Sequence, residues 1–453
     1  MRIKPFVPVF VLLSLTFGLS AVARAGAQPE ALARAAVSAD PAESAPAIAA
    51  LRAMGPSGLQ TLFTIYDAEI KRHTAAAGDT ASTTDDESWQ RLARALDAVA
   101  QQYDSASSGL YWHTDFALAQ AEARRSGKPI LSLRLLGNLN EEFSCANSRF
   151  FRSALYSNAQ ISNLLRERFV LHWKSVRPVP RVTIDYGDGR KLERTLTGNS
   201  IHYILDADGR PIDALPGLYG PQAFQRELLR AEAIARQTAN QPEDQRADTL
   251  RSFHQTRVDA LTQAFKQDVL KAGGQLPAEL GGSNQRPGQS PTARAASRRA
   301  MSKAVTEVSI IESITYESQL LAEATDNDTW NNIAALHTAD AKLDAASLAL
   351  MRRQTLNTTT PAAQPATDQQ RQQFARLVSN FERYLALDTV RNEYLMRIKL
   401  HAWLTSFRFR DDLAAFNEKV YTELFLTPRS DPWLGLFSAD TYTALEHGGV
   451  KEQ

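Results

Sequence analysis

The residues with the clearest capacity for chemistry lie in the segment GKPILSLRLLGNLNEEFSCANS, residues 127–148. It contains Cys145, the only cysteine among 453 residues. The apolar run from Ile130 to Leu136 is bounded by turn residues and predicts a buried strand. The residues after Ser144 predict a helix with Ser144 as its N-cap. The thiol therefore falls at a strand-to-helix junction, where unpaired backbone N–H groups and the helix dipole favour a thiolate.

Two interpretations of Cys145 remain open at this point. A reactive monothiol would form mixed disulfides with other proteins or be capped by a small thiol. Arg149 and Arg152 favour its thiolate, whereas Glu141 and Glu142 oppose it. The alternative is an inert, partly buried cysteine in a domain that kept its fold and lost its chemistry. A single cysteine forms no internal disulfide, so stability must come from core packing.

Composition and the first residues bear on location and partners. Lys and Arg total 51 against 50 Asp and Glu, a net charge of +1 that gives no support for binding to nucleic acid or to an acidic membrane. Arg2 and Lys4 precede an apolar stretch, and Ala23-Arg24-Ala25 fits a cleavage site. We expect residues 1–25 to be a signal peptide, with an uncleaved anchor as the alternative. The mature protein is then periplasmic or secreted, without a membrane span.

Residues 29–105 form an N-terminal segment in which apolar residues recur at helical spacing. The pattern AIAALRAMGPSGLQTLF, residues 47–63, resembles one unit of a HEAT-type helical hairpin. A single such unit cannot bury its own apolar face, so we expect it to pack on a neighbour.

Residues 106–236 combine helix and strand signals. A helix over 115–125 ends at Gly127 and precedes the strand at Ile130 and the helix after Cys145. A second apolar run, 169–173, predicts another strand. Two hairpins follow, 182–196 around Gly187-Asp188-Gly189 and 201–215 around Ala207-Asp208-Gly209. Pro221 then opens a helix that continues through Leu228.

This order, with the residues that carry it, resembles the thioredoxin-like superfamily. The likeness is nearest to secreted members that open with W-x-x-D-x-x-x-A-x-x-x-A-x-x-x-G-K-P, here residues 112–129. The ending LDADGRPIDALPGLYGPQAF, residues 205–224, resembles the last hairpin and helix of the family. The resemblance implies an α+β fold: a thioredoxin-like domain with a β-hairpin insertion, flanked by N-terminal helices and a C-terminal helical bundle.

The resemblance also identifies candidate site residues. The family's redox motif is C-x-x-C, and here Cys145-Ala146-Asn147-Ser148 places Ser148 at the resolving position. The family's cis-proline corresponds to Ser200. His202 lies two residues further along a strand expected beside Cys145, so a Cys145–His202 nucleophilic dyad is a further hypothesis. Without a second sulfur, the two-cysteine redox cycle is not available.

The rest of the chain reads as helical. We expect a long helix over 237–272, a flexible linker over 273–298 and a C-terminal helical domain over 299–453. The periodicity predicts one helix containing three isoleucines at 310–314, one from Trp330 to Leu350, and further helices over 374–385, 390–407 and 413–425. An antiparallel bundle is the plain expectation for these helices.

Metal and cofactor signals are weak. The chain has no H-x-x-x-H, C-x-x-C or EF-hand spacing and no phosphate-binding glycine loop, so we expect no metal and no cofactor. His337, Asp340 and Asp344 follow helical steps of three and four and would share one face of a helix, where a solvated face is the simpler interpretation.

These observations lead to one functional expectation and two alternatives. The first is an exported, non-catalytic protein-binding or scaffold module with protein partners in the periplasm or outside the cell. The second is a thiol–disulfide exchange factor in cell redox homeostasis, using Cys145 as a monothiol with Ser148 and Ser200 beside it. The third is a hydrolase or transferase that uses the Cys145–His202 pair.

Overall fold

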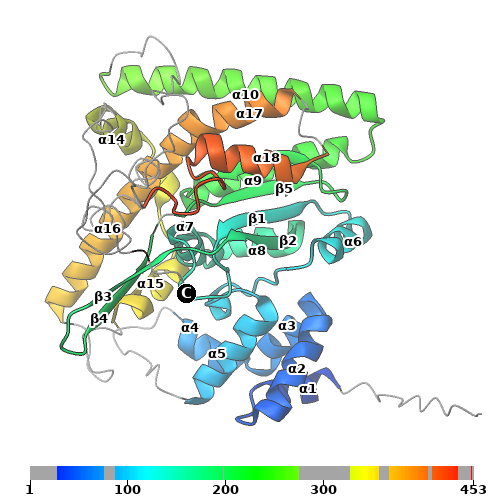
Figure 1. The fold of residues 1–453 in the computed structure, drawn as a ribbon, viewed down its shortest axis with the longest axis vertical. Coiled ribbons are helices and arrows are strands. Elements are labelled where there is room, and N and C mark those ends of the chain that lie inside the picture. The colour runs from blue at the N-terminus through cyan, green and yellow to red at the C-terminus, as the bar shows by residue number, and fades with distance from the viewer. Residues whose placement is uncertain are drawn as a thin grey trace, which may run out of the picture.

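The computed structural model describes residues 28–75, 87–196, 198–274, 327–356, 367–406, 411–436 and 450. Within these residues the protein is mixed α+β, with many helices around two small sheets, as the sequence predicts (Figure 1). The expected signal peptide, nearly all of the expected linker and the three isoleucines at 310–314 lie outside the described residues.

The N-terminal segment is helical, as predicted. It comprises α1 (Pro29–Ala36), α2 (Pro41–Ala53), α3 (Pro56–Ile65), α4 (Asp67–Thr74) and α5 (Glu87–Ala100). The turn between α2 and α3 passes through Gly55, whose φ of 70° lies in the left-handed region that glycine adopts without strain. The apolar faces meet in a buried cluster that includes Leu51, Leu62 and Leu96. These helices therefore cover each other's apolar surface.

The central sheet has four strands in the order β2-β1-β5-β6. Strand β1 (Ile130–Leu136) pairs in parallel with β2 (Val170–Arg177) and antiparallel with β5 (Ile201–Leu205). Strand β5 pairs antiparallel with β6 (Pro211–Pro216). All seven residues of β1 are buried, because helices cover both faces of this central strand.

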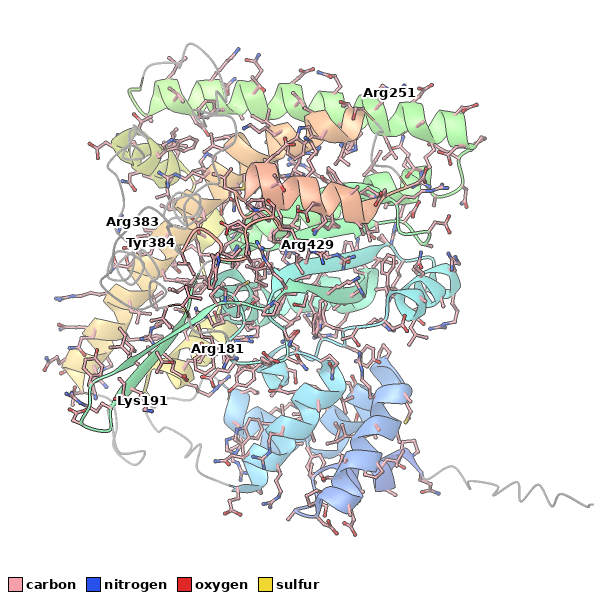
Figure 2. All side chains as sticks on the ribbon, viewed as in Figure 1. Arg181, Lys191, Arg251, Arg383, Tyr384 and Arg429 are labelled. Carbon is pink, nitrogen blue, oxygen red and sulfur yellow. The ribbon has the colours of Figure 1, made fainter. Side chains whose placement is uncertain are left out.

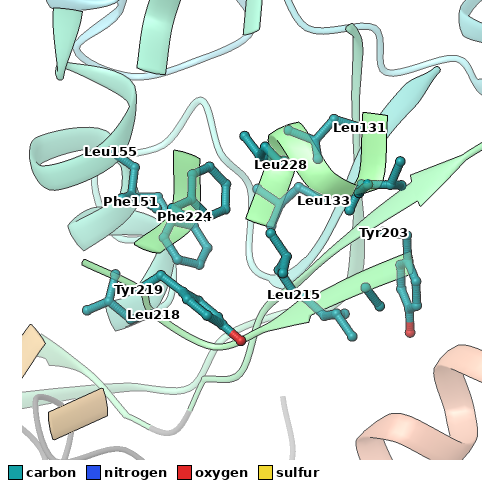
Figure 3. Packing of buried hydrophobic residues seen from close by; sticks show 14 of the residues in the cluster. Leu131, Leu133, Phe151, Leu155, Tyr203, Leu215, Leu218, Tyr219, Phe224 and Leu228 are labelled. Carbon is teal, nitrogen blue, oxygen red and sulfur yellow. The ribbon is translucent and has the colours of Figure 1, made fainter. Parts of the chain in front are cut away.

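The crossover from β1 to β2 is helical but not one helix. It consists of α7 (Ala146–Phe150), a π-helical segment (Phe151–Tyr156) and α8 (Ala159–Arg168). Asn158 separates the last two, because its side chain accepts hydrogen bonds from the N–H groups of Gln160 and Ile161 and so caps α8. With α9 (Pro221–Thr238), the crossover covers one face of the sheet, where Leu133, Phe151 and Phe224 pack together (Figure 3).

The other face of the sheet carries α6 (Phe116–Ser126) at one end and α18 (Leu413–Lys419) further along. Helix α6 begins and ends as predicted: Asp115 accepts from the N–H groups of Ala117 and Leu118, and Gly127 ends it with a φ of 68°. The predicted hairpin insertion forms a separate sheet of β3 (Arg181–Asp185) and β4 (Lys191–Thr195). It projects from the body of the molecule, with Arg181 and Lys191 labelled along it (Figure 2).

The C-terminal helices differ from the sequence prediction in their boundaries. The expected helix over 237–272 is α10 (Glu243–Lys271), because α9 runs on to Thr238. The region from Trp330 to Leu350 is not one helix: α14 (Asn327–Leu336) and α15 (Ala345–Leu356) flank a short 3₁₀ turn (Thr338–Ala341). The two helices expected over 374–385 and 390–407 form one helical run, α16 (Asp368–Arg391), a π-helical segment (Asn392–Arg397) and α17 (Ile398–Thr405).

These helices pack onto the sheet domain as well as onto each other. A single buried apolar cluster extends from Leu110 in the sheet domain to Leu434 near the end of the described chain. Helix α17 lies along α10 and also contacts the edge strand β6, and α10 contacts α9 (Figure 1). The C-terminal helices therefore share one core with the central sheet.

Candidate functional site

Cys145 lies at the predicted strand-to-helix junction, eight residues after Gly137. Its N–H donates to the carbonyl of Leu136 at 3.2 Å, which holds the start of the helix against the end of β1. The N-cap of α7 is Cys145 itself, so the expectation that Ser144 takes this position was wrong by one residue. The thiol is fully buried.

Two serine hydroxyls lie beside the sulfur. Cys145 Sγ lies 3.1 Å from Ser200 Oγ and donates to Ser148 Oγ at 3.5 Å. Ser148 Oγ also lies 2.6 Å from Ser144 Oγ, and all three serines are fully buried. The structure thus brings three of the four predicted site residues together in a closed hydroxyl network.

The C-terminal segment seals this network, which sequence reasoning missed. Tyr421 donates its hydroxyl proton to the carbonyl of Asn199 at 2.8 Å, and the Asn199 amide donates to the carbonyl of Phe425 at 3.3 Å. Burial, with the nearby Cys145 as a smaller cause, raises the pKa of Tyr421. Gly198 also packs closely against Cys145, because a Cβ at this position would lie only 2.4 Å from Cys145 Cβ. No local signal links these segments, because Tyr421 and Asn199 are 222 residues apart.

His202 does not pair with Cys145. Its Nε2 lies 2.6 Å from the hydroxyl of Tyr156, and its ring packs between Phe151 and Phe224. Burial lowers the pKa of His202 to about 3, so the ring is neutral at physiological pH. Its Nδ1 is buried with no hydrogen-bond partner. The hydrogen bond that a Cys145–His202 dyad requires is absent, since the imidazole enters the aromatic core beneath the sheet.

The expected shared helix face of His337, Asp340 and Asp344 does not form. His337 follows the end of α14, Asp340 lies in the 3₁₀ turn, and Asp344 accepts from the N–H of Ala159 at the start of α8. His337 Nδ1 and Asp340 Oδ2 remain 3.8 Å apart, but Asp344 follows the 3₁₀ turn and contacts α8 instead, so the three side chains do not share one helix face. Within the described residues, no three His, Cys, Asp or Glu side chains are arranged to hold a metal ion.

A buried ion network lies on the far side of the sheet from α6. The fully buried guanidinium of Arg397 donates to Asp213 at 2.9 Å, to Glu227 at 2.6 Å and to Glu393 at 3.0 Å. Nearby, His254 and His401 face each other with 3.0 Å between their Nδ1 atoms. Burial lowers the pKa of both histidines, so both rings are neutral. This network joins β6, α9 and the C-terminal helices.

An open cleft lies where the N-terminal helices meet the sheet domain. Its volume is about 1380 Å³. One wall is the turn between α2 and α3, and the others come from α6 and α8. Arg52 supports the junction by donating to the carbonyl of Val99 at 2.9 Å and to that of Trp112 at 2.5 Å. Leu118 on α6 lines the cleft with 61% of its surface exposed.

Comparisons with known proteins identify no relative. No protein-family model, no curated protein and no solved structure matches the chain. Among the helices that the structure describes, none has the length and apolar character needed to cross a bilayer.

Proposed function

We propose that this protein is a non-catalytic binding protein whose residues 106–236 form a thioredoxin-like domain with a hairpin insertion. The strand order β2-β1-β5-β6, with helices crossing between the parallel pair and a helix after the last hairpin, supports the resemblance at residues 112–129 and 205–224. Ser200 beside the sulfur supports its correspondence to the family's cis-proline position.

The proposed binding function rests on the contrast between the buried thiol of Cys145 and the open cleft. Cys145 is fully buried, has hydroxyls where a redox enzyme needs a second sulfur, and is covered by the C-terminal segment. A thiol that is inaccessible to a substrate disulfide cannot exchange with it. The cleft, by contrast, is open to solvent-borne ligands.

The size and lining of the cleft favour a protein segment as its occupant. Its volume of about 1380 Å³ exceeds the roughly 300–1,000 Å³ that is usual for small-molecule pockets. Its lining mixes apolar residues such as Phe63 and Leu118 with charged ones such as Arg125 and Glu122. Mixed lining of this kind is typical of protein interfaces, which combine an apolar centre with a polar rim. The partner is a protein met outside the cytoplasm, following the expected export.

Site-specific photocrosslinking tests the binding proposal. A crosslinking residue replaces Leu118 in the cleft or, as a matched control, Leu270 on α10, whose exposed fraction of 62% is nearly the same. In the cells that make the protein, we expect a discrete crosslinked partner at position 118 and none at position 270. Equal capture at both positions, or none at either, would contradict the cleft as the binding site.

A monothiol exchange factor is the second candidate, favoured by the position of the sulfur at a helix N-cap between two hydroxyls. It requires the Tyr421 segment to move aside. Iodoacetamide labelling separates the two candidates: we expect slow labelling of the native protein and fast labelling in denaturant. Fast native labelling, together with a mixed disulfide that Cys145→Ser abolishes, would favour the exchange factor instead.

A further inference from the structure

Arg134 on β1 is a buried cation without a buried anion. Its side chain is 8% exposed, and among the described residues it makes no ion pair with a carboxylate. The contrast with Arg397, which bonds three carboxylates at 0% exposure, shows how this chain pairs a buried guanidinium elsewhere. Burying a charge without a counter-charge reduces the stability of the folded protein. The presence of Arg134 at this buried position therefore calls for an explanation.

The neighbours of Arg134 orient the guanidinium without neutralising it. Its Nη1 lies 3.4 Å from Nδ1 of His172, and its Cζ lies 6.0 Å from the centre of the Phe116 ring. Because a guanidinium only donates, His172 Nδ1 is the acceptor, and Ser132 Oγ also reaches it at 2.8 Å. Burial, followed by the charge of Arg134, lowers the pKa of His172 to about 3, so its ring is neutral.

The remaining guanidinium donors are free and accessible. Neither Nε nor Nη2 of Arg134 makes a hydrogen bond within the described residues, and neither is sealed from solvent. The phenols of Tyr203 and Tyr421 are the groups whose charges Arg134 senses most strongly. Burial raises the pKa of both phenols, so both are neutral near pH 7. Among the described residues, no negatively charged group therefore pairs with these donors.

A second cation, Lys174, lies beside Arg134 on the neighbouring strand. Lys174 on β2 pairs directly with Arg134 in the parallel register, so their side chains share one face of the sheet. Lys174 is exposed and makes no ion pair within the part of the chain that the structure describes. Its charge reaches His172, two residues earlier on the same face.

We propose that Arg134 and Lys174 form a binding site for an oxyanion group, a carboxylate or a phosphate. The planar fork of a guanidinium donates two parallel hydrogen bonds to such a group, and a nearby ammonium adds a point charge. The anion supplies the missing counter-charge to Arg134. This site goes beyond the proposed protein-binding function, because neither Arg134 nor Lys174 lines the cleft.

Isothermal titration of the full chain at constant ionic strength tests the site, with inorganic phosphate and acetate as separate probes. We expect saturable binding of at least one probe. Arg134→Gln should weaken it about tenfold or more, since a hydrogen bond to a charged group contributes about 1.5–3 kcal/mol. Binding of phosphate alone assigns a phosphoryl ligand, and binding of acetate alone assigns a carboxylate.

Three further variants keep the test independent of folding. Lys174→Gln changes an exposed residue and should also weaken binding, whereas Lys71→Gln, exposed on α4, should leave it unchanged. Arg134→Lys keeps the charge but loses the fork, and should bind more weakly than the wild type. Failure of both probes to bind, or wild-type affinity in Arg134→Gln and Lys174→Gln, would overturn the site. Photocrosslinking at Leu118 is unaffected by either outcome.

Discussion

At the scale of single residues, the two buried arginines show opposite solutions to the same physical problem. Arg397 is surrounded by Asp213, Glu227 and Glu393, whereas in the described part of the chain Arg134 reaches a neutral imidazole and an aromatic ring and no carboxylate. Desolvating a guanidinium costs several kcal/mol, and only close carboxylates offset this within the folded chain. Arg397 is therefore a structural group, while the donors of Arg134 remain available to a ligand.

The first prediction concerns Arg397. Arg397→Met leaves two fully or almost fully buried carboxylates, Asp213 and Glu227, without their main counter-charge. Burial already raises the pKa of Asp213 and Arg397 opposes that shift, so its removal further disfavours the ionised form. We expect a loss of about 3–5 kcal/mol in the free energy of unfolding, measured by urea denaturation.

Arg236→Met is the matched control for this prediction. Arg236 also pairs with a buried carboxylate, Glu232, but its own side chain is 67% exposed. Exposed partners contribute about 0–1 kcal/mol, so this variant should change little. Equal losses in the two variants would show that burial of the arginine does not decide the effect.

At the scale of elements, the connection between α14 and α15 interrupts a helix that the apolar periodicity of the sequence predicts as continuous from Trp330 to Leu350. Polar contacts hold this connection in place. His337 Nε2 lies 2.7 Å from Asp268 on α10, and Asp340 receives two hydrogen bonds from Arg226 on α9, at 2.9 and 3.0 Å. Tyr394 also donates to Asp268, at 2.5 Å. The contacts of His337 and Asp340 tie this connection to two other helices, α10 and α9.

The second prediction is a pH dependence of this connection. Asp340, with Asp268 as a smaller cause, raises the pKa of His337 above its ordinary value, against the opposing effect of burial. The folded protein therefore holds this proton more tightly than the unfolded chain does. The stabilisation is fully present below the unfolded pKa of about 6.5 and is lost as the pH rises through the folded value.

Unfolding free energies of the wild type and His337→Asn, measured from pH 5 to 9, check this dependence. We expect the wild type to lose its advantage over His337→Asn as the pH rises above about 6.5. Asp340→Asn removes the largest cause of the shift and should reduce the pH dependence. A difference between wild type and His337→Asn that grows with pH would contradict the assignment.

At the scale of the whole molecule, the described chain has two large buried clusters. One belongs to the N-terminal helices, from Ala33 to Ala100, and the other extends from Leu110 to Leu434. The second cluster takes side chains from the sheet, from α9 and α10 and from the C-terminal helices. The sheet domain is therefore incomplete without the C-terminal helices, although the sequence resemblance covers only residues 106–236.

The third prediction follows from this division. A fragment of residues 101–453 keeps the larger cluster whole and should unfold in one cooperative transition, measured by circular dichroism against urea. A shorter fragment, residues 101–366, lacks Arg397 and Tyr421, exposes apolar surface that the C-terminal helices cover and should show no cooperative transition. Cooperative unfolding of the shorter fragment would show that the C-terminal helices are an independent domain.

The sequence alone predicted the features that depend on residues close together along the chain. The strands at Ile130, Val182 and Ile201, the end of α6 at Gly127, and the junction that holds Cys145 follow from periodicity and turn residues. The hydroxyls of Ser148 and Ser200, two residues that the sequence analysis singled out, lie beside the sulfur in the folded chain.

Only the tertiary structure decided how these parts meet. The Tyr421 cover over Cys145, the carboxylates around Arg397, the unpaired Arg134, the orientation of His202 into the aromatic core and the cleft all depend on residues distant in sequence. Periodicity reports which side of an element is buried, but not which partner buries it. Whether a buried charge or thiol is closed off or open to a ligand depends on that partner, and so on the folded chain as a whole.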